Sequence, residues 1–256
     1  MHPTLTIALR AAEALSDRLQ HLRKELAQAD DEGLSPKQII SKAMDDAAYR
    51  SIRILRNAYP DQRIEVVGRP EALHEPENEA RSSWYIDILQ GEADFARGGS
   101  HCSTIIYQKA GDKVQHVCIT FPFLDVQYTA TAGRGAQKND HRIRLQSRES
   151  LNGGVVQLDE LLTNLAVPTV AQGASVRITG NPVLDHCLVA EGIADAAISH
   201  TLDEHEALGV ALLLQESGAL TGSMTGAPLR FDRPTSLISG GKRPFMAAVQ
   251  LAKAVN

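Results

Sequence analysis

Apolar residues recur every three or four positions through the N-terminal part of the chain, and this spacing predicts two long amphipathic helices. Gly33 and Pro36 separate the helices, and Tyr59-Pro60 ends the second one, which runs from about residue 38 to residue 58. The apolar face of the second helix includes Ile39, Ala43, Ala47 and Ile54, and that of the first comprises Leu5, Ala8, Leu9, Ala12, Leu15, Leu19 and Leu22.

Short apolar stretches predict strands at 64–67, 84–89, 104–107, 114–120, 126–131 and 194–199. The turn at Gly111-Asp112 and the short intervals around it favour an antiparallel meander over residues 104–131. Gly133-Arg134-Gly135 is a further turn. The segment 69–81 is polar, acidic and contains proline, so we expect it to be a mobile loop.

Helical spacing returns at 158–165, 182–190, 204–217 and 242–255. Pro182 lies in the first turn of its helix, whereas Gly192 and Gly218 follow last turns, which is typical of helix boundaries. Helices and strands come in mixed blocks without regular alternation. We therefore predict an α+β layered sandwich, formed by one domain over 1–256, with an α+β half at 1–140 and an α/β half at 141–256.

The composition and charge of the chain exclude several classes of function. The chain of 256 residues has a formal net charge of −5 and a pI near 6.0, which argues against direct binding to nucleic acid. No stretch has the apolar length of a membrane span, and the N-terminus lacks the pattern of a signal peptide. Cys102, Cys118 and Cys187 match no zinc spacing, so we expect three core residues of a cytoplasmic protein.

Three stretches, taken in order, resemble the motifs of the inositol monophosphatase family. WYIDILQGEADF at 84–95 resembles the family's strand-to-helix metal motif, Trp-x-Ile-Asp-Pro-Leu-Asp-Gly-Thr-x-Asn-Phe. TATAGRGA at 129–136 resembles its Ala-x-x-Gly-x-Gly-Ala turn. HEALG at 205–209 and LLLQESG at 212–218 resemble Trp-Asp-x-Ala-Ala-Gly and the segment that follows it. The opening MHPTLTIALRAA at 1–12 is similar to the bacterial extragenic-suppressor branch, so the resemblance covers nearly the whole chain.

This resemblance implies an αβαβα sandwich and a magnesium-dependent phosphatase of inositol monophosphate or another small phosphate monoester. It places metal ligands at Asp87, at the carbonyl of Leu89, at Gln90 and at Glu206. It places the phosphate cradle at Gly91 and Glu92, and Glu92 takes the position of the family's catalytic threonine. Magnesium binds carboxylate oxygens, polarises the phosphate and activates water.

Several of these positions depart from the family pattern. Gln90 and Glu206 each replace an aspartate, the first removing a charge and the second adding a methylene, and Glu92 puts a carboxylate where phosphate would bind. Val67 and Met44 stand where the family has carboxylates. Three questions remain open. The first is whether Asp45 or Glu65 supplies a missing carboxylate, and the second is whether Asp87 binds a metal or only caps a turn. The third is whether the 203–206 segment caps a helix or forms a new metal site from His205, Glu206 and Asp87.

Two functional hypotheses follow from this pattern. The first is an inositol-monophosphatase-like protein with a weak or absent magnesium site, which acts as a binding or regulatory protein. The resemblance implies a homodimer and, for the extragenic-suppressor branch, protein partners in the transcription machinery. The second is a divergent magnesium-dependent phosphatase that uses Asp87, Gln90 and Glu206. A third hypothesis is a ligand sensor that keeps a pocket of phosphate or sugar size.

Overall fold

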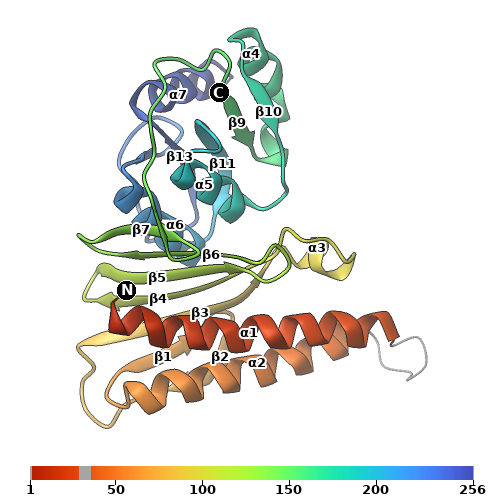
Figure 1. Ribbon diagram of the computed structural model, residues 1–256, viewed down its shortest axis with the longest axis vertical. Coiled ribbons are helices and arrows are strands. Elements are labelled where there is room, and N and C mark those ends of the chain that lie inside the picture. The colour runs from red at the N-terminus through yellow and green to blue at the C-terminus, as the bar shows by residue number, and fades with distance from the viewer. Residues whose placement is uncertain (1, 29–35, 256) are drawn as a thin grey trace. The chain divides into compact units, whose positions relative to one another are not determined.

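The computed structural model describes residues 2–28 and 36–255, and its contacts divide the chain into two compact units, Met1–Thr129 and Ala130–Asn256 (Figure 1). The predicted boundary between halves, near residue 140, falls at the turn between strands β7 (Gly135–Lys138) and β8 (His141–Ile143) of the second unit. Gly33 lies outside the described residues. Within the described ranges, no helix combines the length and apolar character needed to cross a membrane.

Two long helices form the α layer of the first unit, as the spacing predicted. Helix α1 (Pro3–Gln28) packs along α2 (Pro36–Ala58), and both lie against a sheet. All seven positions named for the apolar face of α1 are buried, Leu15 and Leu22 completely. Six of them, all except Leu5, meet Ala43, Met44, Ala47 and Leu55 of α2 in one core that also includes Trp84. Removing these side chains from water is the main stabilising term of this unit.

The sheet of the first unit contains the predicted meander. Its strands have the order β2-β1-β3-β4-β5-β6, with β1 parallel to β3 and the β3-β4-β5 pairs antiparallel. A five-residue helix, α3 (Glu92–Ala96), follows β3. The strand bounds are β1 Arg63–Val66, β2 Arg69–His74, β3 Ser82–Gln90, β4 Ser103–Ala110, β5 Lys113–Phe121 and β6 Val126–Thr131.

One prediction for this unit was wrong. Residues 69–74, expected in a mobile loop, form edge strand β2, which pairs antiparallel with β1 after a turn at Gly68 (φ +71°). An edge position tolerates the exposed, polar residues and the proline that this segment contains, because only one side of the strand is hydrogen bonded. Ala72 also packs against the core of the unit, which favours the strand over a loop.

The second unit is built around a five-stranded sheet of order β10-β9-β11-β13-β12. Strands β10, β9 and β11 are parallel, whereas β13 runs antiparallel to β11 and β12. The unit also holds the hairpin β7-β8. Its elements are β7 Gly135–Lys138, β8 His141–Ile143, β9 Val155–Leu158, η2 Glu160–Leu165, α4 Ala166–Ala171, β10 Ser175–Arg177, α5 Pro182–Glu191, β11 Ala196–Leu202, α6 Glu204–Ser217, β12 Leu220–Gly222, β13 Thr235–Gly240 and α7 Lys242–Val255.

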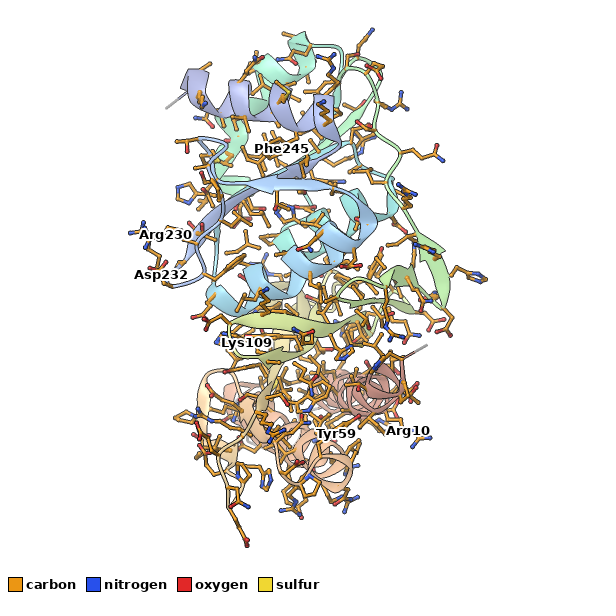
Figure 2. All side chains as sticks on the ribbon, turned by 90° about the vertical axis from the view of Figure 1, so that its left-hand side faces the viewer. Arg10, Tyr59, Lys109, Arg230, Asp232 and Phe245 are labelled. Atoms are coloured by element: carbon orange, nitrogen blue, oxygen red, sulfur yellow. The ribbon has the colours of Figure 1, made fainter. Side chains whose placement is uncertain are left out.

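Helices cover both faces of this sheet. Ile198 and Ile238 point into a core shared with η2 and α7, where Phe245 also packs, and the neighbouring strand positions face α5 (Figure 2). Figure 2 also shows Arg230 and Asp232, an exposed ion pair at 3.1 Å, projecting from the connection between β12 and β13. The first unit therefore supplies one helical layer and one sheet, and the second supplies an α/β/α stack. Each unit thus has the layered α+β architecture that the sequence predicted.

The helix predicted at 158–165 was only partly right. Leu158 ends strand β9, and Asp159 then begins a 3-10 helix by accepting a hydrogen bond from the Leu161 N–H at 2.9 Å. Strands β9 and β10 have four and three residues, too few for a periodic pattern to identify. The helices α5, α6 and α7 lie where predicted, and Gly192 and Gly218 end the first two in the left-handed conformation (φ +83° and +90°).

Helix α5 carries two buried titratable groups. The imidazole of His186, fully buried, bonds Ser239 Oγ at 2.7 Å and Ser199 Oγ at 3.0 Å, and burial lowers its pKa to about 3. Asp185 is 2% exposed. Burial raises its pKa to about 7, while a hydrogen bond donated by Thr179 Oγ1 at 2.8 Å acts in the opposite direction.

We expect Asp185→Asn to gain free energy of unfolding relative to wild type as the pH rises. The folded protein holds the Asp185 proton up to a pKa of about 7, against 3.8 for the ordinary group, so the wild type loses stability between those values. The difference between the two proteins should grow by about 2 kcal/mol from pH 5 to pH 8, measured by urea denaturation. His186 contributes to the pH dependence of the free energy of unfolding in both proteins, so its contribution cancels in the difference between them.

The exposed Asp140 of the same unit provides the control, since Asp140→Asn makes the same change from carboxyl to amide without any burial. A pH-independent difference between Asp185→Asn and wild type would show that the Asp185 carboxyl is ionised throughout this range.

Candidate functional site

The end of strand β3 brings together two of the predicted metal ligands. Asp87 is 5% exposed, and its Oδ2 accepts a hydrogen bond of 2.6 Å from Nε2 of Gln90. Residues three apart on a regular strand point to opposite faces, but the pairing of β3 with β4 shifts register between Asp87 and Gln90. This irregularity lets the two side chains meet, and the Gln90 amide then satisfies one carboxyl oxygen of Asp87.

Gly91 and Glu92 follow immediately as the start of α3. Gly91 is the N-cap residue with φ +81°, a conformation that favours glycine, and no side chain caps the helix there. Glu92 is exposed at the first helical position, where its charge suits the positive end of the helix dipole. Leu89, predicted to contribute its carbonyl, has a side chain that is 7% exposed in the core.

Asp94 is a residue of this segment whose role the sequence did not reveal. Its Oδ2 accepts a hydrogen bond of 2.7 Å from the His101 N–H, and its carboxyl lies against Gly99 where a side chain would clash. Asp94 therefore holds the loop after α3. The neighbouring Gly98-Gly99 pair is the signal in the sequence, because a close backbone approach requires glycine.

Glu206, the predicted ligand of the second unit, takes part in a capping box at the start of α6. Its Oε2 accepts a hydrogen bond of 2.9 Å from the Asp203 N–H, while Asp203 Oδ1 accepts one of 2.8 Å from the Glu206 N–H. This confirms the prediction that the 203–206 segment caps a helix, with Asp203 as the capping residue. The capping box occupies the carboxylate that a metal site would need.

The alternative carboxylates of the first unit are held in ion pairs. Asp45 pairs with Arg69, Glu65 with Arg63 at 3.2 Å, and Asp46 with Arg18 at 3.2 Å and Arg50 at 3.0 Å. At the remaining family positions, Met44 is 4% exposed in the core, and Val67 has no oxygen in its side chain.

These donors do not fit a site for two or three magnesium ions. Such a site needs several charged oxygens around one point. Here the Gln90 amide, which is neutral and donates to Asp87, stands in the place of a carboxylate, and Glu206 is engaged by the backbone of its own helix. Across residues 2–28 and 36–255, no three His, Cys, Asp or Glu side chains form a group suited to a metal ion.

Ser199 and the cysteines have structural surroundings. Ser199 is 1% exposed, and its Oγ is hydrogen bonded to Nε2 of His186 at 3.0 Å. Cys102, Cys118 and Cys187 are free and buried, as predicted. Burial raises the pKa of the Cys102 thiol to about 11 and that of Cys118 to about 12, so neither is a reactive thiolate at neutral pH.

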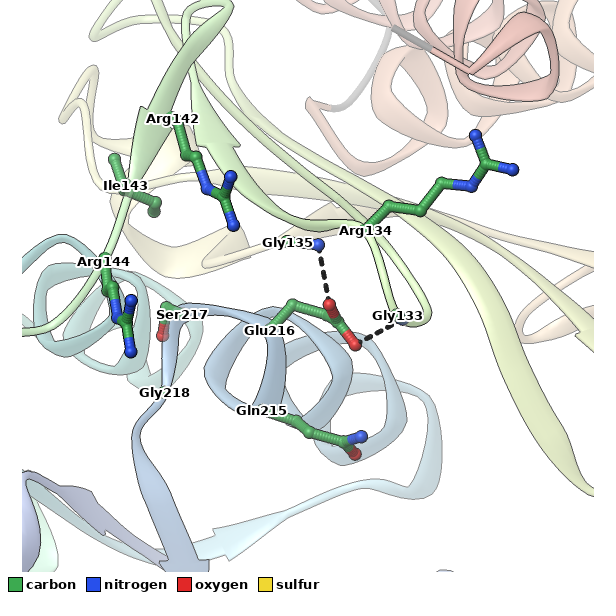
Figure 3. Close-up of a pocket in the computed structure, with 10 residues that line it drawn as sticks. All are labelled: Gly133, Arg134, Gly135, Arg142, Ile143, Arg144, Gln215, Glu216, Ser217 and Gly218. Carbon is green, nitrogen blue, oxygen red and sulfur yellow. Dashed lines mark hydrogen bonds between the residues drawn. The ribbon is translucent and has the colours of Figure 1, made fainter.

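The second and third family motifs meet in the second unit through Glu216, which the sequence did not reveal. The two carboxylate oxygens of Glu216 accept hydrogen bonds from the N–H groups of Gly133 at 2.8 Å and Gly135 at 2.7 Å (Figure 3). The carboxylate thus fixes the turn between β6 and β7 against α6. Beside it lies a cavity of about 480 Å³, lined by Gly133, Arg134, Gly135, Arg142, Ile143, Arg144, Gln215, Glu216, Ser217 and Gly218.

Comparison with known proteins gives one consistent result. The model of the inositol monophosphatase family matches residues 1–255. The chain is 30% identical to Nus factor SuhB of Pseudomonas aeruginosa, over 96% of this chain and 94% of that protein. The crystal structure of the extragenic suppressor protein SuhB from Bartonella henselae has a TM-score of 0.81 at 20% identity, covering 98% of this chain and 100% of that one.

An inositol monophosphatase from Thermotoga maritima is similar in fold to the same degree. Its TM-score is 0.82 at 17% identity, with 99% of this chain and 98% of that chain covered. Together these solved structures confirm the α+β fold of the inositol monophosphatase type that the sequence predicted.

We expect Glu216→Ala to lower the free energy of unfolding by about 2 kcal/mol, because two backbone N–H groups lose a charged acceptor. Glu216→Gln retains one acceptor oxygen and should cost roughly half as much. Chemical denaturation of the purified variants measures both. The neighbouring Gln215 is exposed and makes no such bond, so Gln215→Ala is the control. Equal stabilities for Glu216→Ala and Gln215→Ala would contradict the assigned role.

Proposed function

Because the chain belongs to the inositol monophosphatase family, we propose that it retains the family fold as a binding or regulatory protein and has lost most of the magnesium-dependent phosphatase activity. The hydrogen bond of 2.6 Å from Gln90 to Asp87 carries this proposal. Two carboxylates at that spacing need a cation between them, whereas an amide and a carboxylate satisfy each other directly. The protein therefore has little to gain from a bound cation at this point.

The charge at Glu92 supports the proposal. A phosphate monoester that approached the start of α3 would meet the exposed Glu92 carboxylate, and two negative groups in contact repel each other. The family's phosphate-orienting threonine is neutral at this position. Glu92 therefore acts against substrate binding, and we assign it no catalytic role.

The names of the relatives support the regulatory part of the proposal. The proteins from Pseudomonas aeruginosa and Vibrio cholerae, 30% and 26% identical, are both called Nus factor SuhB. In our proposal this chain, as a homodimer, binds protein partners of the transcription machinery. A net charge of −5 favours contacts with proteins over contacts with nucleic acid.

For the purified wild type we expect no saturable magnesium binding tighter than about 1 mM by calorimetry. We also expect no hydrolysis of inositol monophosphate or p-nitrophenyl phosphate that EDTA abolishes. The variant Gln90→Asp should unfold more easily than wild type in EDTA, because two carboxylates then face each other, and should regain stability when magnesium is added. Thermal unfolding with and without magnesium measures this response.

The control is Gln115→Asp. Gln115 is a half-buried glutamine of strand β5 that is not one of the predicted ligands, so this variant should not respond to magnesium. Robust turnover by wild type, lost on chelation and in Asp87→Ala, would instead establish the divergent phosphatase that uses Asp87, Gln90 and Glu206. That result would contradict the proposal.

We expect Asp87→Ala to keep its affinity for transcription complexes, since binding of protein partners in this proposal needs no metal. Co-sedimentation of the purified chain with RNA polymerase elongation complexes measures this affinity, and the sedimentation mass of the free chain checks the homodimer. Absence of binding by wild type, or binding that requires magnesium, would contradict the regulatory role.

A further inference from the structure

Two arginines of the second unit project together beside the end of helix α6. Arg142 lies on strand β8 and Arg144 directly follows it, and residues two apart on an extended chain point to the same side. A hydrogen bond of 2.9 Å from the Leu145 N–H to the Ser217 carbonyl ties this segment to the last turn of α6. Figure 3 shows both guanidinium groups at the cavity, whereas Arg134 points away from them.

The position of Arg142 is fixed by the turn that Glu216 holds. A Cβ atom at Gly135 would lie 3.4 Å from Nη2 of Arg142, so the guanidinium packs directly over the backbone of the turn. Gly135 has φ +90°, which also favours glycine. The clamp by Glu216 and the missing side chain at Gly135 together place one guanidinium at the cavity wall.

The charges around this cavity are unbalanced. Its lining includes three arginines and one acidic residue, Glu216, whose two oxygens already accept hydrogen bonds from Gly133 and Gly135. Over the described ranges of the chain, Arg134, Arg142 and Arg144 take part in none of the ion pairs, although Arg18, Arg50, Arg63, Arg69 and Arg148 do. Three positive charges and one negative charge leave a local excess of two, in a chain whose net charge is −5.

Guanidinium groups are always charged at neutral pH and present a planar fork of N–H donors that matches the oxygens of a phosphate. Two such forks on one side of a strand can engage one phosphate group or two linked ones. The cavity volume of about 480 Å³ is within the range of small-molecule sites, and leaves room for the remainder of such a ligand beside Gln215 and Gly218.

We propose that this cavity binds a small phosphorylated molecule, of nucleotide or sugar-phosphate size, through Arg142 and Arg144. The cavity is lined by none of Asp87, Gln90, Glu92 and Glu206, so binding there requires no magnesium. The proposal is therefore independent of whether the chain is a phosphatase. The competing account is that the arginines only offset the negative end of the α6 dipole.

The test is calorimetric titration of the full-length chain with pyrophosphate and with ADP, in the presence of EDTA. Both ligands should bind, and the double variant Arg142→Gln/Arg144→Gln should weaken binding at least about tenfold, because two charge-assisted contacts are lost. Arg142→Lys keeps the positive charge but lacks the planar fork of N–H donors, so its affinity for both ligands should lie between those of wild type and the double variant. Arg233→Gln, an exposed arginine of the same unit that does not line the cavity, should bind as wild type does.

Three results would overturn the proposal. The first is an absence of binding by wild type up to about 10 mM ligand. The second is unchanged affinity in the double variant together with a lower melting temperature without ligand, which would assign the arginines to the helix dipole. The third is a short single-stranded RNA that binds through the same arginines more tightly than ADP, which would make the site a contact for a nucleic-acid backbone.

Discussion

A carboxyl group that is buried at the end of a strand must be compensated, and the way this chain compensates Asp87 determines how its candidate site is interpreted. Burial of a charged group is costly unless it is paired and hydrogen bonded. In a magnesium site, the ion and the neighbouring carboxylates share that task. Here a hydrogen bond of 2.6 Å from Gln90 contributes to that task, and the register shift between Asp87 and Gln90 makes this bond possible. The protein itself thus supplies a donor to one carboxyl oxygen of Asp87.

The same principle extends to the other carboxylates. Glu206 is bonded to the backbone of its own helix through the capping box with Asp203, and Asp45, Asp46 and Glu65 are paired with arginines. Each of these four carboxylates has a protein partner. A fold can therefore remain intact after its metal ligands change, provided that every buried or capping carboxylate keeps a donor.

Glu216 stabilises the fold of the second unit and also shapes the cavity beside Arg142. Its carboxylate joins two segments more than eighty residues apart in sequence by bonding Gly133 and Gly135. This clamp holds the turn on which Arg142 rests, and it removes the one acidic side chain of the cavity from competition for the arginines. A structural hydrogen-bond pair thus leaves a positively charged cavity in a chain with an overall negative charge.

The sequence determined the elements whose signals are local. The periodicity of Leu5 to Leu22 predicted α1, the turn residues predicted the meander, and Gly192 and Gly218 marked the ends of α5 and α6. The polar segment 203–206 ahead of a helical pattern indicated a helix cap as one of two alternatives, and the order of three motifs indicated the fold. Each signal operates over a few residues, so a pattern can contain it.

Only the tertiary structure determined the short strands and which polar groups contact each other. Strand β2 exists because β1 offers an edge to pair with. Strand β9 pairs with β11, and β10 pairs with β9, and segments of four and three residues cannot encode these pairings by themselves. The contacts of Gln90 with Asp87 and of Glu216 with the turn depend on a register shift and on a packing of distant segments. Hydrogen bonds act over about 3 Å, so only the folded chain shows which polar groups satisfy each other.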